Sequence, residues 1–241
     1  MSLYSNLPNP SKDAESFLRK SSLFGKLGDE GISQIAPRIQ QRSFASGVTL
    51  YHQDMPGMML YMIEKGCVRV YSLGRTGQEL TLNICGPGDI FGELSSLDRK
   101  PHSATAITLT STLVWLIAHN ELEDLIHQYP AIAAAMIQIL VARVRSTTNQ
   151  IESLTFQDVQ GRLAFELLHL AERHGQKNKT FTEINIPLTQ GDLATIVGAA
   201  RESVNKAISH LRSLDLIAID GTNLTILNPE GLRQVIHDRG R

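Results

Sequence analysis

Polar residues near the C-terminus have the chemistry needed to read DNA bases. Arg201 can donate a bidentate pair of hydrogen bonds to guanine, and Glu202 can accept a hydrogen bond from cytosine. Asn205 and Lys206 follow one helical turn later, and a lysine there can reach a guanine or a phosphate. Side chains suited to phosphate oxygens lie close by in the sequence, at Thr189, Gln190 and Ser203. These residue types and their spacing predict a DNA-contacting surface.

The residues around this group predict a helix-turn-helix that would position it. Thr189 is expected to be the N-cap of a first helix. Gly198 is expected in the turn, where a left-handed backbone conformation costs glycine little. A second helix starting near Ala200 would expose Arg201, Glu202, Asn205 and Lys206 at its N-terminal end. Strand-like runs at 216–219 and 224–227 flank a turn and predict a wing.

A stretch without glycine or proline precedes this region. Residues 131–160 hold neither, which predicts one long helix of about 45 Å. A seam with the alternating spacing of four and three that is typical of a two-stranded coiled coil runs along it, at Ala133, Ile137, Leu140, Val144, Thr147, Ile151 and Leu154. All of these residues are apolar except Thr147. We therefore expect a parallel homodimer whose interface includes Ile137, Leu140, Val144, Thr147, Ile151 and Leu154. The alternative is a helix that packs on its own domain.

The N-terminal half has the pattern of an antiparallel β domain. In residues 44–118, short apolar runs alternate with turn signals, which favours a β-roll or jelly roll. The expected strands are Val48–Tyr51, Met59–Ile63, Cys67–Ser72, Glu79–Ile84 and Thr112–Ile117. Residues 13–41 have helical periodicity, and residues 1–12 are expected to be loose. The predicted fold class is α+β.

Composition excludes several classes of protein. The 241 residues include 23 Lys and Arg against 24 Asp and Glu, and a net charge of −1 argues against a strongly basic nucleic-acid binder. The longest apolar run, Ala131–Ala142, is shorter than the roughly 20 residues of a membrane span. No signal peptide precedes it, so we expect a cytoplasmic protein without a membrane partner. The histidines and cysteines show no metal-ligand spacing, and no catalytic constellation stands out, so we expect no metal and no enzyme.

Taken together, three motifs in order resemble the CRP/FNR family of bacterial transcription regulators, over residues from about 15 to 235. They are Gly88–Leu94 in the sensor half, Phe156–Leu163 at the hinge and Arg201–Val204 in the helix-turn-helix. The resemblance implies a sensor domain at 13–130, a dimerisation helix and hinge at 131–160, and a winged helix-turn-helix at 161–241. It implies an effector-modulated, homodimeric regulator that binds an inverted-repeat DNA site, with RNA polymerase as a further partner.

The resemblance also implies an effector site. In members that bind cyclic AMP, a glutamate holds the ribose hydroxyl, and Glu93 matches it. The backbone that follows meets the phosphate, and Gly92, Leu94 and Ser95 lie there. An Arg-Ser pair clamps the phosphate, but this sequence has His102-Ser103. Two hydroxyl residues that meet the adenine match Thr147 and Thr148. A histidine is mostly neutral at pH 7, so the cyclic-nucleotide prediction is weakened at this one position.

Several alternatives stay open from the sequence. The effector could be cyclic AMP, another small molecule, or absent. An iron–sulfur sensor is disfavoured because no cysteine precedes Cys67. No spacing singles out haem ligands, and a thiol switch between Cys67 and Cys85 is a minor alternative. The rival function is a cyclic-nucleotide-responsive regulatory or scaffold module without DNA binding, in which residues 188–227 would have no use.

Overall fold

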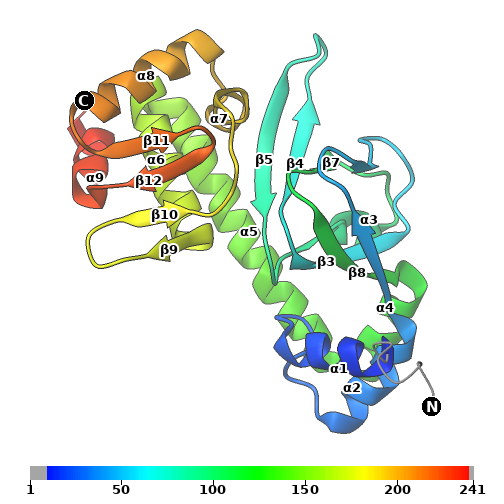
Figure 1. The fold of residues 1–241 in the computed structure, drawn as a ribbon. Coiled ribbons are helices and arrows are strands. Elements are labelled where there is room, and N and C mark those ends of the chain that lie inside the picture. Colours follow the sequence, from blue (N-terminus) through cyan, green and yellow to red (C-terminus); the bar gives the residue numbers. More distant parts are fainter. Residues whose placement is uncertain (1–9, 239–241) are drawn as a thin grey trace, which may run out of the picture. The chain divides into compact units, whose positions relative to one another are not determined.

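A computed structural model describes residues 10–238, and within it the chain forms two compact units. The first consists of Met1–Val68 with Cys85–Arg143, and the second of Arg69–Ile84 with Val144–Arg241. Figure 1 shows the elements of both along the chain. Of the N-terminal residues predicted to be loose, 10–12 are helical, which corrects that prediction, and 1–9 lie outside the described residues.

The sensor region is a β-roll with helices at both ends of its sequence. Its helices are α1 (Pro10–Lys20), α2 (Asp29–Ile35), the 3-10 turn η1 (Ala36–Arg38), α3 (Glu93–Asp98) and α4 (His119–Gln128). Its strands are β1 (Gln40–Phe44), β2 (Thr49–Tyr51), β3 (Met59–Lys65), β4 (Val68–Leu73), β5 (Glu79–Cys85), β6 (Ile90–Phe91), β7 (Thr105–Thr108) and β8 (Thr112–Ala118). The strand orders are β1-β8-β3-β6 and β2-β7-β4-β5. The antiparallel β-roll expected from the sequence is confirmed.

Apolar packing joins the N-terminal helices to the first sheet and to the start of the long helix. Phe24 and Leu18 have no exposed surface, and Trp115 of β8 lies in the same cluster. Phe17 stacks on Trp115 with ring centroids 5.6 Å apart. Leu60 and Met62 of β3 and Ile117 of β8 belong to this cluster too, so the sheet packs directly on the helices.

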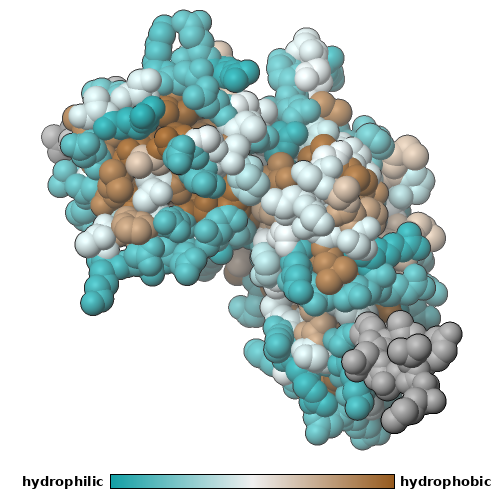
Figure 2. Space-filling view, in the orientation of Figure 1, coloured by the Kyte–Doolittle hydropathy of each residue, from teal (hydrophilic) through white to brown (hydrophobic). Residues whose placement is uncertain are grey.

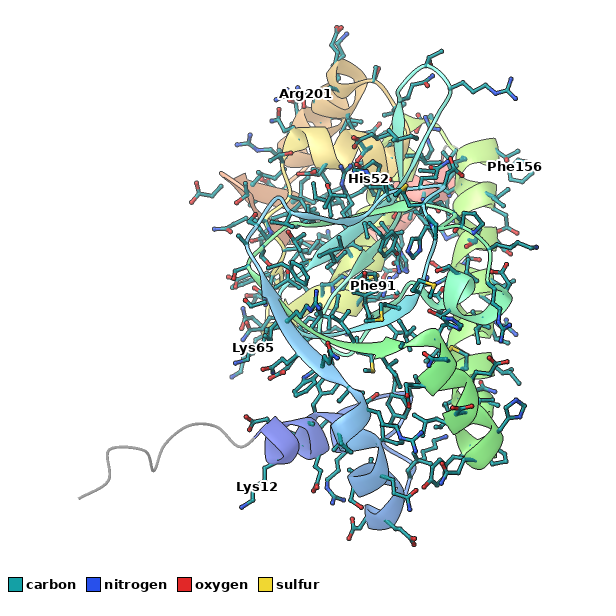
Figure 3. The ribbon with its side chains drawn as sticks, turned by 90° about the vertical axis from the view of Figure 1, so that its right-hand side faces the viewer. Lys12, His52, Lys65, Phe91, Phe156 and Arg201 are labelled. Atoms are coloured by element: carbon teal, nitrogen blue, oxygen red, sulfur yellow. The ribbon has the colours of Figure 1, made fainter. Side chains whose placement is uncertain are left out.

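The long helix is α5 (Pro130–Phe156), and it ends before the predicted residue 160. Asp158 begins a new helix, α6 (Val159–His174), because its Oδ1 accepts a hydrogen bond from the backbone N–H of Gly161 at 2.8 Å. An N-cap side chain is a local signal that outweighs the absence of glycine and proline. Phe156 projects from the end of α5 with 72% of its surface exposed (Figure 3).

By length and composition alone, α5 could cross a membrane, and it is the one such helix in the described part of the chain. This corrects the sequence-based expectation, which counted only the run Ala131–Ala142, interrupted by Gln138. Arg143 lies within α5 and forms an ion pair with a buried glutamate, an arrangement that a lipid-exposed helix would not need.

The second unit contains a compact winged helix-turn-helix. Besides α6, it consists of β9 (Gly175–Lys177), β10 (Thr182–Ile184), α7 (Gln190–Val197), α8 (Arg201–Ser213), β11 (Ile217–Asp220), β12 (Asn223–Ile226) and α9 (Pro229–Asp238). Its sheet has the order β11-β12-β10-β9. The predicted wing is present as β11 and β12. On the face drawn in Figure 2, hydrophobic residues show as separate patches among hydrophilic ones.

Candidate nucleic-acid interface and effector site

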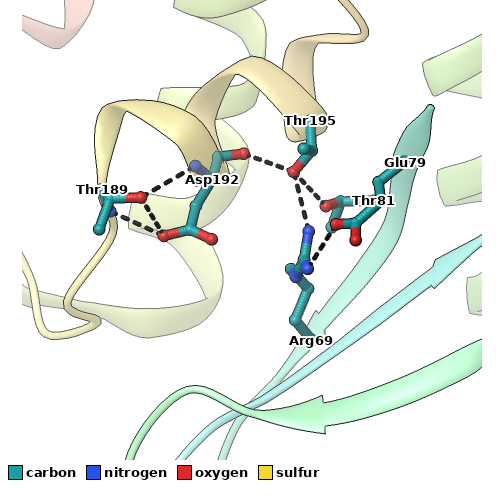
Figure 4. Close-up of polar contacts among 6 residues, drawn as sticks. All are labelled: Arg69, Glu79, Thr81, Thr189, Asp192 and Thr195. Carbon is teal, nitrogen blue, oxygen red and sulfur yellow. Dashed lines mark hydrogen bonds and ion pairs between the residues drawn. The ribbon is translucent and has the colours of Figure 1, made fainter. Parts of the chain in front are cut away.

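The first helix of the helix-turn-helix begins at a complete capping box. Thr189 Oγ1 accepts from the backbone N–H of Asp192 at 3.1 Å, and Asp192 Oδ2 accepts from the backbone N–H of Thr189 at 2.9 Å (Figure 4). Two N–H groups that a helix start leaves without partners are thereby satisfied. Thr189 and Gln190 are exposed at this helix end, where the free N–H groups favour anions such as phosphate.

The turn and the second helix have the geometry expected from the sequence. Gly198 has φ +64°, a left-handed conformation, and α8 starts at Arg201. Arg201, Glu202 and Ser203 are all exposed in the first turn of α8. Figure 3 shows Arg201 at that end of the helix. Lys206 Nζ lies 2.9 Å from Glu202 Oε1, so these two side chains form an i,i+4 ion pair on the exposed face.

Asn205 departs from the sequence-based expectation of an exposed side chain. It is half-buried, and its Oδ1 is buried without a hydrogen-bond partner. Its neighbour Val204 is fully buried, because this side of α8 packs on the rest of the unit. Asn205 therefore lies at the edge of the DNA-facing surface, and its carbonyl oxygen faces the protein.

In the sensor, Glu93 is buried and forms an ion pair that the sequence did not predict. Glu93 is 1% exposed, and its Oε1 accepts a hydrogen bond from Nη1 of Arg143 at 2.7 Å. Nη2 of Arg143 donates to the carbonyl of Ile90 at 3.2 Å. Arg143 comes from α5, fifty residues away in sequence. The one available signal was a charged residue inside a largely apolar helix.

His102 lies in a second group of side chains close to the first. Its ring stacks on Tyr51 with centroids 3.6 Å apart, and its Nδ1 lies 3.0 Å from Ser95 Oγ. Burial lowers the pKa of His102 below its usual range, so the ring is neutral at pH 7. Burial raises the pKa of Tyr51, and Glu93 and Arg143 also act electrostatically on that hydroxyl. The two groups therefore share one electrostatic environment.

The remaining predicted effector residues do not all belong to the unit that contains Glu93. Gly92 has φ +76° and precedes α3 directly, which only glycine tolerates without strain. Leu94 and Ser103 are exposed. Thr147 and Thr148 are exposed on the part of α5 that belongs to the second unit, whereas Glu93 belongs to the first.

Comparison with known proteins matches each half of the chain to a known domain family. Residues 41–129 match the cyclic nucleotide-binding domain family, and residues 161–235 match the Crp-like helix-turn-helix domain family. A CRP-like cAMP-activated global transcriptional regulator of Mycobacterium tuberculosis is 33% identical over 90% of this chain and 97% of that protein. The chain belongs to the CRP/FNR family of transcription regulators.

Two further similarities agree with this assignment. The cyclic AMP receptor protein of Thermus thermophilus is 30% identical over 80% of this chain and 87% of that protein. The structure of FixK2 from Bradyrhizobium japonicum, which is 22% identical, covers 82% of this regulator and 96% of FixK2 with a TM-score of 0.73 and shows the same fold. The family consists of transcription regulators rather than enzymes. The match to the helix-turn-helix domain leaves no support for the rival module without DNA binding.

The predicted dimer seam of the regulator is an exposed apolar stripe in the single chain. Ile137, Val144 and Ile151 are 57%, 65% and 58% exposed. Leu140 and Leu154 are half-buried, and Thr147 is exposed. Isolated leucines on a surface need no explanation, but a stripe at coiled-coil spacing predicts a partner helix. Dimerisation is typical of the family, whereas these particular contacts stay a prediction.

Proposed function

We propose that this regulator is a homodimer that binds an inverted-repeat DNA site under the control of a small effector bound next to Glu93. The observation that carries the effector half is the Glu93 carboxylate, which is buried at 1% exposure and pairs with Arg143. It also acts electrostatically on Tyr51, whose ring stacks on His102. Buried charges of this kind cluster at functional sites because keeping one ionised requires specific partners. Cyclic AMP is the first candidate, since relatives in both Mycobacterium and Thermus carry cAMP in their names.

The residues fit the two ends of a cyclic nucleotide unequally. Glu93 and Ser95 supply acceptor and hydroxyl groups suited to a sugar hydroxyl or a phosphate oxygen. The phosphate charge finds weaker support, because Arg143 already pairs with Glu93 and the buried His102 is neutral. Gly92 would contribute only backbone groups to the effector site, and Leu94 and Ser103 would contribute from its exposed side. A second candidate is therefore an effector that carries hydroxyl groups and less negative charge.

On the DNA side, Arg201 and Glu202 would read base edges in the major groove, with Lys206 beside them. Thr189, Gln190 and Ser203 would hold phosphates and fix the register, and Asn205 would contribute from the edge through its amide group. The Glu202–Lys206 ion pair is exposed, so DNA contacts would replace it at little cost. A dimer presents two such helices, which calls for an inverted repeat. RNA polymerase is the expected further partner, and the cytoplasm is the expected location.

The coupling between the two sites would run along α5. Arg143 lies one helical turn before Thr147 on the same helix, and the seam continues to Leu154. An effector that engages Glu93 would compete for, or reinforce, its contact with Arg143 and so shift α5. Thr147 and Thr148 would then meet the effector from the dimer seam. Differential affinity of the effector for two arrangements of the seam supplies the coupling free energy.

Calorimetry tests the effector. The full-length protein is titrated with cyclic AMP and, separately, with cyclic GMP. We expect binding heat that Glu93→Gln abolishes and His102→Arg strengthens, because arginine restores a fixed positive charge. The exposed Glu30→Gln is the matched control and should bind like the wild type. Absence of heat in both the wild type and His102→Arg excludes a cyclic nucleotide and leaves the second candidate.

Gel-shift and binding assays test the DNA half. The dimer should bind inverted-repeat duplexes from promoter regions of its own genome and slow their migration in the gel. Arg201→Ala should lose discrimination at one guanine by about 1–3 kcal/mol, whereas Lys206→Ala should weaken binding and change its salt dependence. Arg233→Ala on α9, an exposed arginine in the same unit, is the control. If no such duplex is bound even at low salt, the proposal is wrong.

A further inference from the structure

The hairpin formed by β4 and β5 belongs to the same compact unit as the helix-turn-helix. Residues Arg69–Ile84 pack with that unit, while the chain on both sides, at Val68 and Cys85, continues into the sensor unit. The hairpin is therefore continuous in sequence with the sensor at both of its ends, and it packs non-covalently with the DNA-binding elements. This route does not follow the backbone of α5.

Arg69 is the centre of the polar contact between this hairpin and α7 (Figure 4). Its Nη2 donates to Glu79 Oε2 at 2.6 Å, and its Nη1 donates to Thr195 Oγ1 at 3.2 Å. Its guanidinium also lies 4.3 Å from the centroid of the Tyr71 ring. The Arg69 side chain is 9% exposed. A buried cation held by a carboxylate, an aromatic face and a hydroxyl has a fixed position.

The Thr195 hydroxyl uses all of its hydrogen-bonding capacity in this contact. It donates to the carbonyl of Asp192 at 2.8 Å. Since a hydroxyl has one hydrogen and two acceptor sites, it accepts from Arg69 and from Thr81 Oγ1, which lies 2.8 Å away. Replacing this hydroxyl by a methyl group would leave two donors of the hairpin without an acceptor. The contact is therefore specific to a hydroxyl residue on α7.

Apolar and backbone contacts continue the same attachment. A Cβ placed on Gly198, in the turn before α8, would lie 3.3 Å from Leu80 of the hairpin and 3.2 Å from Leu154 of α5. Gln150 of α5 donates to the carbonyl of Thr81 at 3.1 Å. The hairpin thus touches both the first helix and the turn that sets the direction of the second.

This attachment leaves the DNA-facing residues free. Thr195 lies five residues after Gln190, which at 3.6 residues per turn is about 140° around α7. Gln190, Arg201 and Lys206 are all exposed with the hairpin in place. The contact between the hairpin and α7 is therefore compatible with DNA binding. Its geometry suits a hairpin that orients the helix-turn-helix, not one that blocks its DNA-facing residues.

We propose that Arg69 is a positioning residue that fastens the β4–β5 hairpin to Thr195 of α7 and holds the helix-turn-helix in its DNA-binding orientation. The hairpin transmits the state of the sensor to the turn at Gly198 without passing through the dimer seam. This inference rests on the DNA-binding function of the regulator and adds a second path of control to it.

Substitutions at both ends of the contact test the proposal in the full-length dimer. Thr195→Val and Arg69→Gln should each weaken binding to an inverted-repeat duplex roughly 10-fold, within the usual range of coupling between sites. The double variant should lose no more than the stronger single one, because both remove the same contact. Thr195→Ser keeps the hydroxyl and should bind like the wild type, as should Thr155→Val, which removes an exposed hydroxyl of α5.

A cross-link separates positioning from a general loss of packing. Thr81→Cys with Thr195→Cys places two thiols where the hydroxyl oxygens lie 2.8 Å apart. Oxidised glutathione should join them, and the locked protein should bind DNA with wild-type affinity and no longer respond to the effector. Reduction with dithiothreitol should weaken DNA binding roughly 10-fold. The wild type, taken through the same oxidation, controls for Cys67 and Cys85.

The outcomes are distinguishable. If the wild type binds DNA and both Thr195→Val and Arg69→Gln bind equally well, the positioning role is wrong while the regulatory function stands. If the locked protein no longer binds DNA, the hairpin obstructs DNA and the proposal is overturned. If the wild type itself binds no inverted repeat, both the function and this inference fail.

Discussion

Arg143 of α5 donates a hydrogen bond to Glu93, the buried glutamate of the sensor motif, with 2.7 Å between Nη1 and Oε1. Glu93 is almost completely buried, whereas the Arg143 side chain keeps 29% of its surface exposed. The ion pair thus joins the candidate effector site to the helix that carries the predicted dimer seam. A ligand that donates to Glu93 Oε1 would compete with this contact.

Removing one partner of the Glu93–Arg143 pair should destabilise the protein. Arg143→Met leaves a buried carboxylate uncompensated, and we expect a loss of about 3 kcal/mol in the free energy of unfolding, at the low end of such effects because Arg143 is partly exposed. Urea unfolding measures it. Glu93→Gln combined with Arg143→Met should cost less than the sum of the two single changes. Additive losses would show that the two side chains are not coupled.

His102 should make stability depend on pH. Its pKa is lowered in the folded state from the ordinary value of 6.5, so the unfolded chain binds more protons in the interval below that value. Stability should therefore be fully present above about pH 6.5 and should fall as the pH drops toward the folded pKa. His102→Gln should show a smaller decline between pH 7.5 and 5.5 in thermal unfolding. An equal loss of stability in both proteins would contradict the assignment of this pH dependence to His102.

Gly198 and Gly191 form a matched pair for testing the turn. Gly198 has φ +64°, and a Cβ there would also press on Leu154 and Leu80. Gly198→Ala should cost about 1–2 kcal/mol of stability. Gly191 lies inside α7, where a Cβ would meet no atom closer than 3.5 Å, so Gly191→Ala should be neutral or stabilising by up to about 1 kcal/mol. Equal effects measured by chemical denaturation would contradict the argument from backbone conformation.

The capping box at Thr189 should contribute measurable stability. Thr189→Ala removes the acceptor for the N–H of Asp192 and should cost about 1 kcal/mol. Thr189→Ser keeps the oxygen and should cost only a few tenths of a kcal/mol. Thermal unfolding of the two variants makes the comparison. A loss of similar size in Thr189→Ser would point to the methyl group rather than to the cap.

Most of the helix-turn-helix was predictable because its signals are local. An N-cap threonine, a left-handed glycine and the start of α8 lie within a dozen residues, and each acts on its own stretch of backbone. Asn205 was misjudged because helical spacing alone does not say how far the packed side of a helix extends. The end of α5 was misjudged for the opposite reason, since the local cap at Asp158 was overlooked.

Parts of the β-roll could not be read from the sequence pattern. β1 pairs only with β8, at the edge of its sheet, and four of its five residues are exposed, so it shows no apolar alternation. β6 has two residues, too few for any period to show. Both strands exist because partners distant in the sequence supply their hydrogen bonds.

The sequence by itself determined the α+β class and the helix-turn-helix, and it named the candidate site residues and the dimer seam, whose roles stay predictions. Only the tertiary structure decided that Arg143 pairs with Glu93, that His102 is buried against Tyr51, and that Arg69 meets Thr195. The physical reason is sequence distance. Periods and caps record what neighbouring residues do to one backbone segment, whereas an ion pair or a stacked ring depends on where the folded chain brings separate segments together.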